Sequence, residues 1–214
     1  MKKALPVLLA MMLMTGCASN DTAASKSSSS RMGCEWQDSS ENCNTDDTGT
    51  AKTEEVGKAS DMSGYESYDP DTEYVFVNSD VRNMLHKMID GDTFVTYFGF
   101  SSCPWCRDAM PILNETALKY NAKVDYIDTR SDPSWDSNLD LKDYDQLVDA
   151  IGDLFPTDED GKAHLDVPFV VFFKDGKVVY SAGYPQYDAH ERKINDEEAQ
   201  EERDNYTKGF EAIQ

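Results

Sequence analysis

The hydrophobic and polar positions of residues 72–214 follow the two periods expected of strands and helices. Short runs of β-branched and aromatic residues predict strands, and apolar residues three and four positions apart predict amphipathic helices. Strands are expected at residues 74–77, 94–100, 123–127, 169–173 and 178–180. Helices are expected at residues 79–90, 104–121, 141–155 and 196–213. The predicted order is therefore β-α-β-α-β-α-β-β-α, in a segment long enough for one domain with its own core.

Two local signals sharpen these boundaries. The first predicted helix should bury one apolar stripe and stop at Asp90-Gly91, a typical helix end. The stripe consists of Val81, Met84, Leu85, Met88 and Ile89. Asp175-Gly176 separates the last two strands and predicts that a tight hairpin turn joins them.

Residues 1–16 have the pattern of an export signal. Lys2 and Lys3 precede an apolar run of around ten residues, which is shorter than the about 20 that a spanning helix needs. The stretch Leu13-Met-Thr-Gly-Cys17 resembles a bacterial lipobox, with Met14 where Leu is usual. The resemblance implies cleavage before Cys17, lipid (diacylglycerol and palmitate) on that residue, and anchoring at the outer face of a bacterial cell membrane. An ordinary secretory signal and an uncleaved anchor are the alternatives.

Residues 17–71 are rich in Ser, Thr, Asn, Asp and Gly and poor in aliphatic residues. Such a composition cannot bury enough surface to offset the entropy of ordering, so a disordered tether is predicted. Disulfides persist outside the cytosol, and Cys34 and Cys43 would close a small loop in this tether. The loop is either a structural staple or a pair that exchanges with the cysteines further along the chain.

The charge of the chain excludes two classes of partner. The 214 residues include 41 acidic and 20 basic side chains, for a net charge of −21. A chain this acidic is repelled by phosphate backbones and by anionic lipid. We therefore expect no nucleic-acid binding, and any attachment to a membrane would depend on the lipid at Cys17.

The sequence Cys103-Pro-Trp-Cys106 is the strongest candidate for chemistry. It follows the predicted strand 94–100 and opens a predicted helix, whose free N–H groups and positive dipole end stabilise a thiolate on the first cysteine. The second cysteine lies within reach to close a disulfide. Half of a zinc site is the alternative, but the other half is missing, because the three His residues are scattered.

These motifs together resemble the thioredoxin family over about residues 72–214. The matching stretches are Cys103-Pro-Trp-Cys-Arg-Asp-Ala-Met-Pro111 and Val167-Pro-Phe-Val-Val-Phe-Phe-Lys-Asp-Gly-Lys-Val178. The resemblance implies an α/β thioredoxin fold, in which helices flank a central mixed sheet. Within the family, Phe98-Gly-Phe-Ser-Ser-Cys-Pro-Trp-Cys-Arg107 is most similar to the thioredoxin-like bacteriocin transport accessory proteins.

The resemblance also implies roles for individual residues. Cys103 would exchange with the substrate sulfur, and Cys106 would resolve the mixed disulfide. Pro168 is expected to be cis and to place the backbone of Val167 beside Cys103, where a substrate strand would pair. No cofactor and no metal are implied.

Three departures from the family limit this transfer. Tyr97 stands six residues before Cys103, where the family has a buried acid, and a phenol with a pKa of about 10 is a poor proton acceptor. Pro104-Trp105 replaces Gly-Pro, and Trp105 either contacts substrate at the rim or only shapes the dipeptide. About 20 extra residues between 130 and 166 form either a cap over the substrate groove or a solvated excursion.

The sequence thus predicts an extracytoplasmic thiol–disulfide oxidoreductase that acts on the thiols or disulfides of exported proteins. The direction of transfer and the need for a redox partner in the membrane stay open. A non-catalytic thioredoxin-like binding module at the cell surface is the first alternative. A metal carrier that uses Cys103, Cys106 and His164 is the second.

Overall fold

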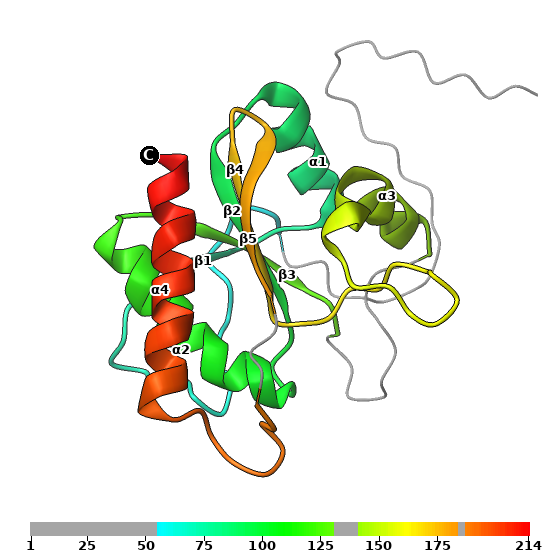
Figure 1. Ribbon diagram of the computed structural model, residues 1–214. Coiled ribbons are helices and arrows are strands. Elements are labelled where there is room, and N and C mark those ends of the chain that lie inside the picture. The colour runs from blue at the N-terminus through cyan, green and yellow to red at the C-terminus, as the bar shows by residue number, and fades with distance from the viewer. Residues whose placement is uncertain (1–54, 131–140, 184–186) are drawn as a thin grey trace, which may run out of the picture. The chain divides into compact units, whose positions relative to one another are not determined.

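The computed structural model describes residues 55–130, 141–183 and 187–214 (Figure 1). Cys17, Cys34 and Cys43, the predicted signal peptide and most of the predicted tether lie outside these residues. Within the described part of the chain, no helix is long and apolar enough to cross a membrane.

A five-stranded mixed sheet forms the centre of the folded unit, in the order β1-β3-β2-β4-β5. The three strands β1, β3 and β2 are parallel, β4 pairs antiparallel with β2, and β5 pairs antiparallel with β4. Their bounds are Phe76–Asn78 for β1, Phe94–Gly99 for β2, Val124–Asp128 for β3, Phe169–Lys174 for β4 and Lys177–Ala182 for β5. Every residue of β2 is buried, as expected of a central strand covered on both faces.

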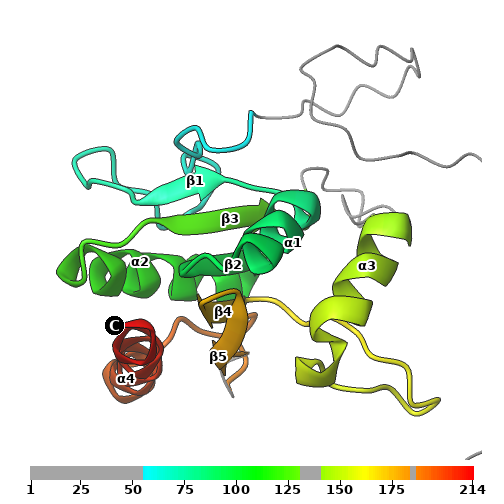
Figure 2. The ribbon, with the colours of Figure 1, turned by 90° about the horizontal axis from the view of Figure 1, so that it is seen from above.

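Helices cover both faces of this sheet. α2 and α4 lie on one face, and α1 and α3 lie on the other (Figures 1 and 2). Their bounds are Val81–Asp90 for α1, Pro104–Lys119 for α2, Leu141–Ile151 for α3 and Asp196–Ile213 for α4, and a 3₁₀ turn at Gly152–Leu154 follows α3. This order and topology are those of the thioredoxin fold, so the predicted fold class is confirmed.

Side chains capable of capping set the ends of these helices. The carboxylate of Asp80 accepts a hydrogen bond from the Asn83 N–H at the start of α1, and Gly91 ends the helix with φ 77°. Asn195 and Glu198 form a reciprocal capping box at the start of α4. The predicted ends of these two helices at Asp90-Gly91 and at residues 196 and 213 are therefore confirmed.

The two faces of the sheet have separate hydrophobic cores, because alternate residues of each strand point to opposite sides. Val95, Tyr97, Val170 and Phe172 pack under α2 and α4. Phe94, Phe98, Val171 and Phe173 pack under α1 and α3. Both cysteines of the candidate pair belong to the first core.

Two predictions from the sequence are wrong. The folded unit does not begin at residue 72, because Met62 and Tyr65 are buried in the core under α2 and Ala59 pairs with Val77 of β1. Residues 55–71 are therefore part of the domain and not of a tether. Ile89 does not belong to the buried stripe of α1, since 82% of it is exposed.

Gly176 in the β4–β5 turn tests how closely the hairpin packs against the end of α1. Its φ is 72°, and a methyl group there would overlap the carbonyl oxygen of Met88. We expect Gly176→Ala to lower the free energy of unfolding by about 2–4 kcal/mol. The alanine would have both the backbone strain of a left-handed conformation and a steric overlap with Met88. Gly161→Ala is the matched control, since Gly161 has φ 77° with open space around it. Equal losses for the two variants in urea unfolding would contradict the packing argument.

Candidate functional site

The Cys103 side chain forms the N-terminal cap of α2, just after the central strand β2. Its Sγ accepts a hydrogen bond from the Cys106 N–H at 3.2 Å. Pro104 occupies the first helical turn, where its missing N–H removes no hydrogen bond from the helix. The two cysteines are free thiols, both are buried, and the structure brings them together as predicted.

The pKa of Cys103 lies below the ordinary value for a thiol. Its contact with the Cys106 side chain is the main cause, and the N–H groups of Cys106 and Trp105 and the charge of Arg130 lower it further. Burial acts in the opposite direction but does not reverse the shift. This sulfur is therefore the easier of the two to ionise. Arg130 could not be identified from the sequence, because it lies just after β3 and 27 positions from Cys103.

Cys106 has the opposite environment. It is completely buried, and burial, together with the neighbouring Cys103 sulfur, raises its pKa well above the ordinary value. A charged sulfur is costly there because no water can solvate it. The pair therefore consists of one thiol prepared for ionisation and one held neutral.

The peptide bond between Val167 and Pro168 is cis, as predicted. It lies just before β4, and the Val167 carbonyl accepts a long hydrogen bond from the Cys103 thiol at 3.7 Å. Pro168 itself is buried, whereas Val167 is partly exposed. The structure thus places the backbone of Val167 at the reactive sulfur, although these residues are 64 positions apart.

Trp105 is held by the segment that precedes α4. Its indole N–H donates to the Tyr187 carbonyl at 2.8 Å, and its ring meets His190 edge-on at 4.7 Å between centroids. Trp105 remains partly exposed. This side chain therefore joins the cysteine pair to residues 187–190, an arrangement that the sequence did not predict.

The buried side chain of Asp108 binds the same segment before α4. Its carboxylate receives two hydrogen bonds from the Arg107 guanidinium, at 2.7 and 2.9 Å, one from the Tyr187 hydroxyl at 3.0 Å and one from the Ile194 N–H at 3.0 Å. Burial by itself raises the pKa of Asp108, but the hydrogen bonds from Arg107, Ile194 and Tyr187 lower it below the ordinary value. Sequence reasoning missed Asp108 because neighbouring residues on a helix do not normally face each other.

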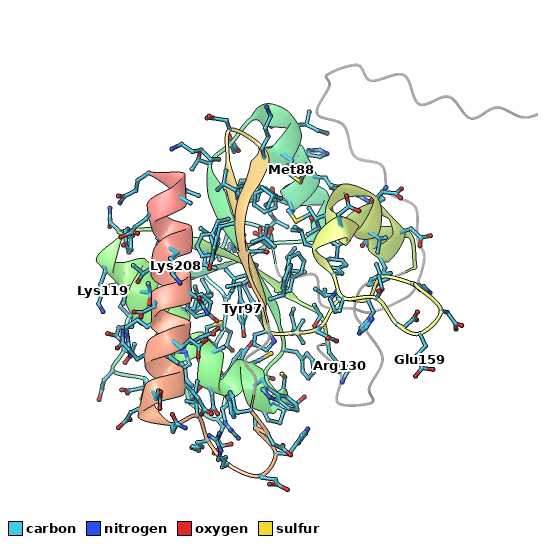
Figure 3. All side chains as sticks on the ribbon, in the orientation of Figure 1. Met88, Tyr97, Lys119, Arg130, Glu159 and Lys208 are labelled. Atoms are coloured by element: carbon cyan, nitrogen blue, oxygen red, sulfur yellow. The ribbon has the colours of Figure 1, made fainter. Side chains whose placement is uncertain are left out.

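Tyr97 is completely buried under the cysteine pair, at the centre of the sheet (Figure 3). Its ring stacks on Tyr126 at 5.6 Å, and within the described residues its hydroxyl has no hydrogen-bond partner. Burial, then the neighbouring Cys106, raises the pKa of Tyr97 well above the ordinary value. The phenol therefore stays neutral and packs in the core, as the sequence suggested.

The metal-carrier alternative has no structural support in the described part of the chain. No three His, Cys, Asp or Glu side chains gather there as metal ligands. His164 lies instead 3.3 Å from Asp166, measured between Nε2 and Oδ1. The roles predicted for Cys17, Cys34 and Cys43 lie outside the described residues and stay predictions.

Comparison with solved structures finds proteins of the thioredoxin fold. Thioredoxin O2 from Arabidopsis thaliana is 23% identical, with 56% of this chain and 90% of that chain covered and a TM-score of 0.32. Desulfothioredoxin from Desulfovibrio vulgaris Hildenborough is 15% identical, with 53% of this chain and 83% of that chain covered and a TM-score of 0.32. Thioredoxin from Plasmodium falciparum is 12% identical, with 63% and 99% covered and a TM-score of 0.33. No family model and no curated protein matches the chain, and the similarity to bacteriocin transport accessory proteins stays a prediction.

The Asp108 network leads to a prediction about stability. Asp108→Asn should lower the free energy of unfolding at pH 7 by about 1–3 kcal/mol, since the amide cannot satisfy the Arg107 guanidinium and the other buried donors together. The pKa of Asp108 is lowered in the folded state, so its stabilising effect is present above about pH 4 and is lost as pH falls through the folded pKa. The difference between wild type and variant should therefore shrink below pH 4.

Urea unfolding at pH 7 and pH 3 measures this difference. Asp145→Asn is the matched control, because Asp145 is exposed on α3. A loss at pH 7 no larger than that of the control would contradict the structural role of Asp108.

Proposed function

We propose that this thioredoxin-fold protein is a thiol–disulfide oxidoreductase in which Cys103 exchanges with substrate and Cys106 resolves the mixed disulfide. The observation that carries the proposal is the unequal environment of the two sulfurs. The Cys103 sulfur accepts the Cys106 N–H and has a lowered pKa, whereas Cys106 is completely buried with a raised pKa. Since the thiolate is the nucleophile, this difference selects Cys103 for the first step.

The reduction of a substrate disulfide then takes two exchanges. The Cys103 thiolate attacks one substrate sulfur, so that a mixed disulfide forms and the other substrate sulfur leaves as a thiolate. Cys106 loses its proton to the departing sulfur or to water and attacks the Cys103 sulfur, which releases the second substrate thiol and closes the Cys103–Cys106 disulfide. The substrate gains two electrons and the protein loses two. The same steps in reverse oxidise a substrate dithiol.

The backbone at Val167 supports a mode of substrate binding. Its carbonyl already contacts the Cys103 sulfur, and the partly exposed Val167 precedes the cis proline just before β4. An extended substrate segment would pair with this backbone and bring its own sulfur to Cys103. Pro104 and Trp105 would form the opposite side of that contact, since both are partly exposed.

We also propose that the protein acts outside the cytosol on exported proteins. The lipobox-like stretch that ends at Cys17 supports attachment to a bacterial membrane through lipid. The Ser-rich segment that follows supports a tether between the lipid and the folded unit, with a span on the order of 35 Å if the roughly 38 residues of 17–54 are flexible. A protein placed there as a reductant would need a membrane partner to supply its electrons.

Replacement of each cysteine separates the two roles. Cys103→Ser should abolish the reduction of a disulfide-containing protein such as insulin, because the attacking sulfur is lost. Cys106→Ser should instead trap a mixed disulfide with the substrate, visible by mass spectrometry. Circular dichroism of both variants controls for folding. Turnover that survives in Cys103→Ser would overturn the assignment, and a wild-type disulfide that stays inert under mild reductant would favour the binding module.

The pKa difference predicts selective alkylation. In the reduced protein, iodoacetamide should modify Cys103 and leave Cys106 protected. The pH midpoint, at which Cys103 reacts at half its maximal rate, should lie below the pKa of a free cysteine, which is about 8.5. Arg130→Gln should raise that midpoint, because the charge of Arg130 helps to lower the pKa of Cys103. Peptide mapping assigns the modified residue. A Cys103 midpoint at or above that of the free amino acid would contradict the asymmetry.

The direction of transfer depends on the reduction potential of the pair. Equilibration with glutathione measures it in a chain with Cys17, Cys34 and Cys43 changed to Ser. A value near about −120 mV would identify a disulfide donor, and a value near about −270 mV would identify a reductase.

A further inference from the structure

A cavity of about 460 Å³ lies beside the reactive sulfur. Phe100 and Arg130, which follow β2 and β3, line one side of it. The segment between α3 and β4 lines the other side, and Val167, whose carbonyl contacts the Cys103 sulfur, belongs to this lining. Figure 3 labels Arg130 and, on the opposite segment, Glu159. The extra residues of this chain thus form a wall of a cavity at the site.

Hydrogen bonds hold this wall in place. The Tyr144 hydroxyl on α3 donates to the Ala163 carbonyl at 3.2 Å and accepts from the Leu165 N–H at 3.1 Å. The His164 N–H donates to the Pro156 carbonyl at 3.0 Å. The described part of the extra segment is therefore held by hydrogen bonds and lines the cavity, while residues 156–162 within it are exposed.

The charge of the lining is opposite to that of the whole chain. Among the described residues, two cationic side chains, Arg130 and Lys162, and the imidazole of His164 line the cavity together with one carboxylate, that of Asp158. Overall the chain has 41 acidic and 20 basic side chains. The Asp158 carboxylate accepts hydrogen bonds from the N–H groups of Asp160 and Lys162, at 3.0 and 2.8 Å. These bonds stabilise the turn formed by residues 158–162.

Apart from Thr129, the other described residues of the lining are apolar or aromatic. Phe100, Tyr144, Leu165 and Val167 all contribute to the lining, and the Arg130 guanidinium lies over the Phe100 ring at 4.5 Å. Asp166, which does not line the cavity, faces His164 at 3.3 Å. The cavity thus offers hydrocarbon contact together with cationic groups, which suits a short chain that ends in a carboxylate.

We propose that this cavity binds a carboxylate-bearing group next to the reacting sulfur of the substrate, so that Cys103 exchanges preferentially with disulfides flanked by acidic groups. The inference rests on the proposed function. The carboxylate could belong to an acidic residue of a protein substrate or to a small carboxylate thiol. The exchange itself is unchanged: the reduced protein loses two electrons and becomes a disulfide, and the bound disulfide gains them and leaves as two thiols.

The net charge of the chain makes this proposal testable, because by itself it predicts a preference for cationic disulfides over anionic ones. A chain with a charge of −21 attracts cationic reactants and repels anionic ones at low ionic strength. An advantage for an anionic disulfide must therefore arise from local groups near Cys103.

The experiment compares three disulfides of similar size. The reduced full chain, with Cys17, Cys34 and Cys43 changed to Ser, reacts at low salt with dithiodipropionate, bis(2-hydroxyethyl) disulfide or cystamine, which are anionic, neutral and cationic. Each rate is divided by that of the same disulfide with 2-mercaptoethanol, which removes differences in intrinsic reactivity. We expect the anionic compound to exceed the neutral one by about fivefold, the effect of one unit charge at about 4 Å in water.

Two variants with the same change in net charge locate the effect. Lys162→Glu should lower the anionic-to-neutral ratio by about fivefold or more. Lys177→Glu should leave the ratio unchanged, because Lys177 is exposed at the hairpin, at the far end of β4 from Pro168. Circular dichroism of both variants checks that they are folded. Equal ratios for the two variants would overturn the proposal.

The outcomes also separate this inference from the proposed function. If wild type prefers cystamine, the cavity does not select carboxylates, but the exchange activity stands. If none of the disulfides oxidises the reduced protein and the oxidised protein oxidises no dithiol, the proposed function itself fails. Two peptide disulfides of equal length, with Glu or Gln beside the cysteine, identify the source: preference for Glu supports a protein segment, and preference confined to the small acid supports a carboxylate thiol.

Discussion

The hydrogen bond from the Cys106 N–H to the Cys103 sulfur is the interaction on which the site depends. It requires Cys103 to cap α2, so the first sulfur lies at the positive end of the helix and the second one turn inside it. The central strand β2, which is buried along its whole length, holds this helix start in place. The Cys106 side chain and the N–H groups at the helix start thus lower the pKa of Cys103, whereas burial raises the pKa of Cys106.

The core below the pair sustains that difference. Cys106 is surrounded by the cluster that contains Tyr65, Tyr97 and Tyr126, and the Tyr65 and Tyr126 hydroxyls are 3.1 Å apart. Within this cluster, burial raises the pKa of Tyr65 and of Tyr97 well above the ordinary value, so neither provides a base near Cys106 at neutral pH.

Two segments outside the basic fold shape access to Cys103. On one side, Asp108 holds residues 187–194 so that the Tyr187 carbonyl accepts the Trp105 indole N–H. On the other side, the segment after α3 lines a cavity next to Val167. The start of α2 thus positions the two sulfurs. Residues 187–194 and the segment after α3 form the surroundings of the Cys103 side chain.

The order of strands and helices and the cysteine pair were predictable from the sequence, because they depend on local periodicity and on motifs within a few residues. The α4 bounds and the end of α1 at Gly91 were predictable for the same reason. The cis form of Pro168 was expected only from the resemblance to the thioredoxin family. The burial of Met62, the exposure of Ile89 and the position of Arg130 beside Cys103 were decided only by the tertiary structure. Those features depend on contacts between distant segments, and the packing of the whole domain determines which side chains meet there.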